Sequence, residues 1–475
     1  MNIVYIHTHD TGKYIKPYGR QVPTPNLLSF AKEALLFTNA FNGSPTCSPS
    51  RASFMTGTYP HQNGMLGLAH RGFQLVDFDW HLASYLKSMD FETVLCGVQH
   101  EHRFWKPLKQ GEEAAKELGY TTHLTSDMEG YQVSSSLTEW DKENAQRVVE
   151  YVRKRERQDK PFFLSYGLYT THREYPSLTE EEKEGDFNPN YIEVPAGTFQ
   201  DEKSRLDTAQ FHKSAQIADD CFGQVIDVLK EQDLYDETLI LFSTDHGVAN
   251  PFMKGSLTDA GIGVPLIIRH PDRPDSYSRV SDQLVSHLDV FPTICDCLDL
   301  EKPDHLEGKS FIEVFQNVHK KTREAVFAET NFHTSYEPAR CIRTERYKYI
   351  KYVDESFQKY NLSNCDESYP KEMLMENGWA EKTKGQEYLY DLYFDPLEGN
   401  NLVHDVQYQE IVCSMREELR QWQIKTSDPL LQGKLDYSPS WKVNKKSSFH
   451  PSSKEPEDYE QVPEPSSTSD RNRQG

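Results

Sequence analysis

The stretch PFFLSYGLY at residues 161–169 decides the fold. It is almost entirely apolar or aromatic, and an unbroken run of this length is typical of a strand buried on both faces of a sheet. The runs NIVYIH at 2–7 and ETLILFS at 237–243 have the same character. Amphipathic helical patterns at 139–157 and 211–232 lie between them. This alternation predicts an α/β fold with a large mixed, mostly parallel sheet between helices.

Shorter patterns complete this organisation. We expect helices at 26–36, 81–89 and 405–425, and strands at 92–96, 264–269, 325–329, 339–353 and 388–393. The last three strands predict a small antiparallel sheet. The domain predictions are therefore a large α/β domain at 1–325, a smaller C-terminal α+β domain at 326–434 and a disordered tail rich in Ser, Pro and Glu at 435–475.

The charge balance excludes several classes of partner. The 475 residues include 52 Lys and Arg against 74 Asp and Glu, a net charge of −22. We expect no nucleic-acid partner, because such binding requires phosphate neutralisation by cations. We expect no membrane partner either, because the sequence has neither a polybasic patch nor a run of about 18 apolar residues. A locally positive pocket for a small anion remains compatible with this charge.

The start of the sequence and the cysteine pattern favour an intracellular location. A strand begins at residue 2 with no charged leader before it, which predicts a cytoplasmic location. The eight cysteines are scattered, so we expect no disulfide framework. Cys295 and Cys297 form a C-x-C pair without a partner cluster and are interpreted as core thiols.

Histidine and aspartate residues follow four of the predicted strands. Ligands of α/β sheets sit beyond the carboxyl ends of the strands. The residues at those ends are His9 and Asp10, Asp245 and His246, His172, and His100 with His102. Their convergence predicts a metal-assisted active site.

A cysteine motif supplies a candidate nucleophile. Cys47-Ser48-Pro49-Ser50-Arg51 follows a loop and opens a helical segment. A thiol at a helix N-terminus with an arginine one turn on is in an electropositive setting, and Arg51 would clamp an anionic substrate. The alternative is a loop cysteine without chemistry.

C-S-P-S-R resembles the signature of the type I sulfatases, within the alkaline-phosphatase-like superfamily. The longer stretch CSPSRASFMTGTYPHQNGML at 47–66 is most similar to the heparan N-sulfatases, or sulfamidases. Further similar segments are TDHG at 244–247, SHLDVFPTI at 286–294 and EYLYDLYFDPLEGNNL at 387–402. The matches run in family order from about residue 2 to about residue 402.

The resemblance implies a formylglycine mechanism. A maturation enzyme would convert Cys47 into formylglycine, and one hydroxyl of the hydrated aldehyde would attack sulfur while the metal and Arg51 hold the sulfate. Asp245 is the candidate to accept the proton of this hydroxyl. His172 or Lys254 would protonate the leaving atom, and His100 would take the proton of the second hydroxyl. Only a geminal diol permits this final elimination; a plain Cys or Ser does not.

By position, the resemblance also places five residues at a divalent metal: His9, Asp10, Cys47, Asp245 and His246. The family usually has Asp-Asp at the first pair and binds Ca²⁺. An oxygen-rich site suits Ca²⁺ or Mg²⁺, whereas two imidazoles shift preference towards Mn²⁺ or Zn²⁺. His9 is interpreted either as a ligand or as a capping imidazole beside the metal.

One basic residue of the family pattern is missing. The family commonly has G-K-x-H, and this chain has Gly97-Val98-Gln99-His100. Val98 therefore stands where the lysine would be, and His102 or Arg103 is the candidate replacement, with His102 assigned to substrate binding.

Two further cations are implied. Lys254 matches a sulfate-binding lysine of the family, or else is a solvated loop lysine. Arg340 either reaches the substrate from the C-terminal domain or is a rim charge.

The resulting hypothesis is a sulfatase that hydrolyses a sulfamate or sulfate ester of a small sulfated saccharide, first of all an N-sulfoglucosamine-like sugar. One alternative is a phosphodiesterase or phosphonate monoester hydrolase of the same superfamily. Another is an inactive homologue that only binds sulfated glycans: the presence of Cys47, Arg51, Asp10 and Asp245 argues against it, and Val98 argues for it.

Overall fold

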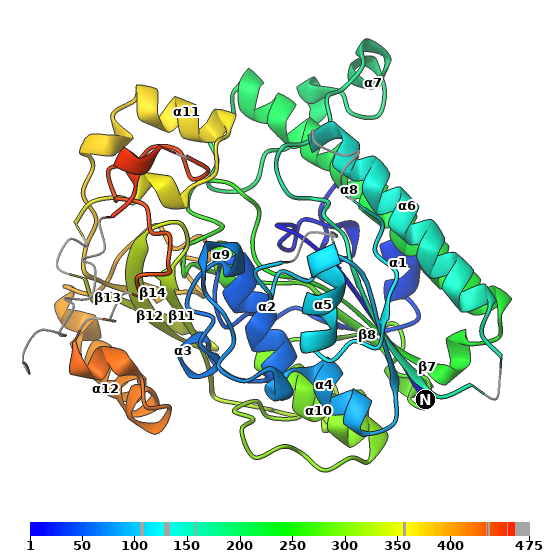
Figure 1. Ribbon diagram of the computed structural model, residues 1–475. Helices are drawn as coiled ribbons and strands as arrows, with labels where there is room; N and C mark the ends of the chain where they lie inside the picture. Colours follow the sequence, from blue (N-terminus) through cyan, green and yellow to red (C-terminus); the bar gives the residue numbers. More distant parts are fainter. Residues whose placement is uncertain are drawn as a thin grey trace, which may run out of the picture.

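The computed structural model describes residues 1–104, 109–127, 134–156, 159–354, 358–433, 435, 438–453 and 455–460. Within these residues an eight-stranded sheet lies between two groups of helices, and a four-stranded sheet packs beside it (Figure 1). The predicted α/β fold with a smaller C-terminal sheet is confirmed.

The large sheet has the strand order β5-β4-β6-β1-β7-β8-β2-β9. Its strands are β1 (Asn2–Thr8), β2 (Leu35–Phe37), β4 (Glu92–Gly97), β5 (Thr122–His123), β6 (Phe162–Gly167), β7 (Thr238–Thr244), β8 (Leu266–Arg269) and β9 (Arg279–Ser281). Strand β8 runs antiparallel to both neighbours, and the other pairs are parallel, so the sheet is mixed and mostly parallel.

The predicted helix at 26–36 is too long. Helix α1 (Pro25–Ala31) ends early, and Leu35–Phe37 form β2 instead. This short apolar run pairs with β8 on one side and β9 on the other, and these tertiary hydrogen bonds override a weak local helical pattern.

Alternating side chains of β1 bind two helical layers to the sheet. Val4 and Ile6 pack towards one layer, whereas Ile3 and Tyr5 pack towards the other. The first layer contains α1, α6 (Ser134–Arg153) and α8 (Glu202–Glu231). The second contains α2 (Cys47–Thr56), α4 (Leu82–Ser88), α5 (Lys109–Glu117) and α10 (Val290–Leu298).

The C-terminal sheet is antiparallel and is covered on both faces. Its elements are β11 (Ala325–Phe332), β12 (Tyr336–Thr344), β13 (Tyr347–Tyr352) and β14 (Glu387–Asp391), with α11 (Tyr369–Glu376) inserted before β14 and α12 (Gln409–Lys425) after it. Leu419 and Trp422 of α12 pack on one face. Phe41 and Ile262 of the large domain pack on the other face.

Five short elements complete the fold: β3 (Ala40–Phe41), which pairs with β10 (Val285–Ser286), and the helices α3 (Pro60–Asn63), α7 (Glu180–Glu184) and α9 (Asp259–Ile262). All eight cysteines are unpaired, as expected. No helix among the described residues has both the length and the apolar character needed to cross a bilayer.

The described part of the segment predicted to be disordered, up to residue 460, packs against the domain. Val443 is buried, and Arg71 donates hydrogen bonds to Asn444 Oδ1 at 2.8 Å and to the carbonyl of Pro451 at 2.6 Å. The prediction of disorder is therefore wrong for 438–453 and 455–460, where a buried arginine and a few apolar side chains fasten a polar sequence to the domain. Residues 461–475 lie outside the described residues.

Strand register sets the ends of the central strands level with one another. His7 of β1 is paired with Gly167 of β6 and Ser243 of β7, and Gly97 of β4 is also paired with Gly167. A Cβ atom on Gly97 would lie 1.9 Å from the carbonyl oxygen of Gly167, and Gly97 has a φ of 80°, so only glycine fits. The residues that follow these strands therefore emerge at a common edge.

Candidate active site

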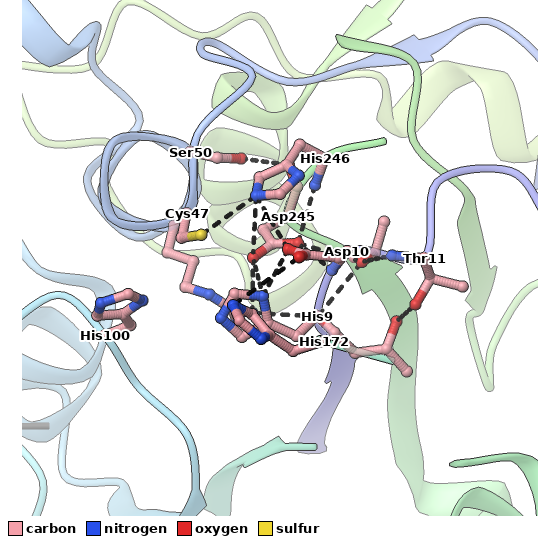
Figure 2. A network of polar contacts seen from close by, with 12 residues as sticks. His9, Asp10, Thr11, Cys47, Ser50, His100, His172, Asp245 and His246 are labelled. Atoms are coloured by element: carbon pink, nitrogen blue, oxygen red, sulfur yellow. Dashed lines mark hydrogen bonds and ion pairs between the residues drawn. The ribbon is translucent and has the colours of Figure 1, made fainter. Parts of the chain in front are cut away.

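Five side chains converge at this edge. The potential ligand atoms of His9, Asp10, Cys47, Asp245 and His246 all lie within 4.8 Å of one another, and all five residues are buried. His9 Nδ1 is 2.8 Å from Asp10 Oδ1 and 3.0 Å from Asp245 Oδ2, and His246 Nε2 is 3.3 Å from Asp10 Oδ1. Figure 2 shows these residues from the ends of β1 and β7 and the start of α2 pointing at one centre.

The donor set fits a divalent metal ion. Burial acts to raise the pKa of the Asp10 carboxyl, but Lys254, His172 and His9 hold it well below its ordinary value. The pKa of Asp245 is also lowered against the effect of burial, by His246, His9 and Arg51. Burial lowers the pKa of His9 to about 4, so its imidazole is neutral at pH 7. Two buried carboxylates beside the imidazoles of His9 and His246 are a set that a cation would satisfy.

Arg51 is fastened inside this group. Its Nη2 donates to Asp245 Oδ2 at 2.9 Å and to the carbonyl of Thr8 at 3.1 Å, and its Nη1 lies 2.5 Å from His7 Nδ1. Its Nε has no hydrogen-bond acceptor among the described residues. The guanidinium is thus held rigidly and retains a donor for an anion.

Cys47 is the first residue of α2, where backbone N–H groups lack helical partners. Its Sγ lies 3.3 Å from His246 Nε2. Burial raises the pKa of the Cys47 thiol well above its ordinary value, although Lys254 opposes this effect.

Lys254 and His172 both lie close to the Asp10 carboxylate. Lys254 Nζ donates to Asp10 Oδ2 at 2.7 Å and lies 3.0 Å from Asp366 Oδ2. Lys254 is buried, so the alternative of a solvated loop lysine is wrong. His172 Nε2 is 3.9 Å from Asp10 Oδ2, and its side chain keeps 25% exposure, which leaves it accessible to a ligand.

His100 lies on the Cys47 side of the site, apart from the carboxylates (Figure 2). Its ring centroid is 5.9 Å from that of His9. His70, which sequence reasoning did not select, stacks on it with centroids 5.3 Å apart and places Nδ1 3.1 Å from His100 Nε2. A left-handed backbone with φ of 58° turns His100 into this position.

The structure does not bring His102 or Arg103 to the cluster. His102 Nε2 faces Glu117 Oε2 at 3.1 Å, and Arg103 is exposed, with its guanidinium 4.7 Å from the ring centroid of Phe104. Val98 is fully buried. Within the described residues, neither candidate replaces the lysine missing at Val98, because the loop after His100 turns both side chains towards α5 or solvent.

Arg340 is also in a different place from the expected one. It is 1% exposed, and its Nε and Nη2 donate to the two Asp428 oxygens at 2.7 and 2.8 Å. Its Nη1 donates to Asn331 Oδ1 at 2.9 Å. The assignment to substrate binding is corrected accordingly: these contacts make Arg340 a buried link between β12 and the chain after α12.

We expect Arg340→Met to destabilise the protein by about 3–5 kcal/mol without changing KM, because Asp428 would be left as a buried unpaired carboxylate. Burial raises the pKa of Asp428, but its hydrogen bonds to Arg340 lower it to about 2. Urea unfolding and steady-state kinetics measure the two effects. The control is Arg420→Met on the exposed face of α12, where a change within about 0.5 kcal/mol is expected. A raised KM with unchanged unfolding would restore Arg340 to the substrate site.

Two acidic residues, the half-buried Asp366 and the buried Glu101, were missed by sequence reasoning. Asp366 reaches Lys254 from the segment between β13 and β14, and no local pattern marks it. Glu101 is buried beside Arg51, and burial raises its pKa to about 8 although Arg51 opposes the shift. Its position directly after His100, in a strand-end loop, was an available signal.

A buried centre of carboxylates and imidazoles, with a cysteine on a helix N-terminus and a firmly held arginine beside it, has the parts that a metal-dependent hydrolase of anionic esters needs. Set at the edge of this mixed sheet, it defines the class as alkaline-phosphatase-like hydrolases. Within that class the chain belongs to the sulfatase family, the hydrolases of sulfuric esters. The sulfatase family model matches residues 1–300, and a model described as N-sulphoglucosamine sulphohydrolase, C-terminal, matches residues 246–384.

Individual proteins agree with this assignment. The chain is 26% identical to human N-sulphoglucosamine sulphohydrolase over 86% of each chain. Among solved structures, a putative sulfatase from Bacteroides thetaiotaomicron superposes with a TM-score of 0.69 at 20% identity, covering 92% of this chain and 95% of the other. A phosphonate monoester hydrolase of Agrobacterium radiobacter superposes with a TM-score of 0.66 at 19% identity, covering 92% of this chain and 100% of the other. The structural likenesses show the shared fold.

Proposed function

We propose that this chain releases sulfate from a small sulfated sugar, with an N-sulfoglucosamine-like sulfamate as the first substrate and a sugar O-sulfate as the second. The observation that carries the proposal is the placement of Cys47 on the N-terminus of α2, within the buried group that also holds Asp245 and the clamped Arg51. The similarity to N-sulphoglucosamine sulphohydrolase supports the choice of sugar.

Each residue of the site has a role in sulfate release that follows from its position. Arg51 and Lys254 are the cations that hold a sulfate group against the centre. His172, the more open of the two flanking imidazoles, protonates the leaving nitrogen or oxygen. His100, on the Cys47 side, accepts the proton that must leave residue 47 at the end of the cycle. Asp245 orients Arg51 and is also placed to accept a proton from residue 47.

Two groups would complete this site. A divalent metal held by Asp10, Asp245 and His246, with Cys47 and His9 beside them, would supply Lewis-acid charge next to the sulfate oxygens. Formylglycine formed from Cys47 would supply a geminal diol as nucleophile, and a formylglycine-generating maturation enzyme is therefore a required partner.

The imidazoles of His9 and His246 favour Mn²⁺ or Zn²⁺ over the Ca²⁺ typical of the family. We expect His9→Asp to shift the ratio of Ca²⁺ to Mn²⁺ affinity towards Ca²⁺ by about tenfold, because a carboxylate replaces a nitrogen donor. Calorimetric titration of the metal-free protein with each ion measures this ratio independently of turnover. His319→Asp makes the same change at an exposed residue and is expected to leave the ratio unchanged. An unchanged ratio in His9→Asp would make His9 a capping imidazole.

Product analysis tests the proposed function. N-sulfoglucosamine, glucosamine 6-sulfate and an aryl sulfate would each be supplied beside an aryl phosphate and an aryl phosphonate monoester. The proposal predicts sulfate release, fastest from one of the two sugars. Faster cleavage of either phosphorus ester than of every sulfate would contradict it.

That contrary result would favour the second candidate function, a phosphodiesterase or phosphonate monoester hydrolase. The specific observation behind it is the nitrogen-rich donor set at His9 and His246, which departs from the oxygen ligands that suit Ca²⁺. Saturable glycan binding without any product would instead favour an inactive sulfated-glycan-binding homologue.

A further inference from the structure

An exposed aromatic residue stands next to the active-site lysine. Phe252 is two residues before Lys254 and keeps 44% of its surface exposed. Its backbone is left-handed, with φ of 65°, a conformation that aromatic residues rarely adopt. Backbone conformations of this kind are costly and persist only where the surrounding structure maintains them. They are found most often at functional sites.

The surrounding loop holds Phe252 in this conformation. The side-chain hydroxyls of Ser256 and Thr258 both donate to the Phe252 carbonyl, at 2.7 and 3.0 Å. Two further rings pack against the exposed one: the ring centroids of Trp379 and Tyr360 lie 5.5 and 6.0 Å from that of Phe252, and 5.6 Å from each other. Phe252 is therefore a supported platform and not a loose surface residue.

This platform is continuous with the catalytic group. Tyr360, Trp379 and Asp366 all belong to the segment between β13 and β14, and Asp366 contacts the Lys254 ammonium at 3.0 Å. The backbone span from residue 252 to residue 254 is at most about 7 Å, comparable with the width of one sugar ring. The Lys254 side chain points inwards to Asp10, whereas the Phe252 ring remains exposed.

We propose that Phe252, supported by Trp379 and Tyr360, forms a stacking subsite for the second pyranose ring of an oligosaccharide, the ring joined to the sugar that carries the sulfate. This proposal rests on the proposed function and deepens it. The C–H face of a pyranose is apolar enough to cover an aromatic ring, and such contact removes apolar surface of both partners from water. The subsite makes a disaccharide or longer chain a better substrate than the single sulfated sugar.

The test compares Phe252→Gly with the unmodified protein on two substrates: N-sulfoglucosamine, and a disaccharide with N-sulfoglucosamine at its non-reducing end. Glycine suits the left-handed backbone but removes the contacts of the ring with Trp379 and Tyr360, so the unfolding temperature of the variant is measured beside its rates. We expect kcat/KM for the disaccharide to fall roughly tenfold because KM rises when the contact with one aromatic ring is lost. We expect kcat/KM for the monosaccharide to stay the same.

The control is Phe394→Ala, which removes a ring that is 81% exposed beyond β14. This control variant is expected to leave kcat/KM unchanged for both substrates. An equal loss on both substrates, or no loss on either, in Phe252→Gly would overturn the subsite. If the unmodified protein releases sulfate from neither sugar, the proposed function fails. The subsite is then tested by NMR saturation transfer to the unsulfated disaccharide. Loss of transfer in Phe252→Gly supports the subsite, and equal transfer overturns it.

Discussion

Replacing Cys47 by alanine is expected to lower kcat for sulfate release by at least about 10⁴-fold, the scale on which nucleophile removal acts in other hydrolases. Cys47 begins α2, lies 3.3 Å from His246 and belongs to the buried group that would hold the metal. No other described cysteine lies in that group. Initial rates with the best sulfated sugar measure the effect.

Two further variants test whether the nucleophile must be a geminal diol at residue 47. Cys47→Ser keeps a hydroxyl of similar size but cannot form a geminal diol, so it is expected to be as inactive as Cys47→Ala. Cys413→Ala removes an exposed thiol from α12 and is expected to leave the rate unchanged. Serine activity within about tenfold of the unmodified protein would argue against the geminal-diol mechanism.

Asp245→Asn is expected to lower kcat/KM by about 10³-fold and metal affinity by at least about 100-fold, since even residues that only support a ligand affect affinity by 10–100-fold. Asp245 Oδ2 lies 2.9 Å from Arg51 Nη2 and 3.0 Å from His9 Nδ1, so in the proposed site one carboxylate would serve both the Arg51 clamp and the metal. Asparagine keeps the shape but loses the negative charge that both need.

Metal content of the purified variant and its rates across a metal titration measure these losses. Asp227→Asn makes the same substitution on the exposed surface of α8 and is expected to change neither quantity. Partial recovery of activity at high metal concentration would separate the metal role from the Arg51 role. Normal metal content with a normal rate would remove Asp245 from the site.

The sequence predicted the parts of the site that follow strands. His9, Asp10, Asp245 and His172 come directly after apolar runs, and the register of parallel strands brings such residues together without further information. The same logic placed His100. These predictions needed only local strand patterns and the rule that parallel strands end at a common edge.

Residues whose position depends on long-range packing were not predictable in this way. Asp366 meets Lys254 only because the segment between β13 and β14 folds over the large domain. Arg340 lies inside β12, and the strand pattern does not reveal that Asp428, 88 residues later, pairs with it. The β2 strand was assigned to a helix because three residues carry too little local signal to outweigh the preceding helix.

The most direct test of the central claim is the mass of the tryptic peptide that contains Cys47, measured on active protein from its native host. Conversion of the thiol to the aldehyde lowers the mass of this peptide by about 18 Da relative to the peptide with a reduced cysteine. The proposed mechanism predicts that loss in active protein, on Cys47 and on no other cysteine. An intact Cys47 thiol in fully active protein would contradict it.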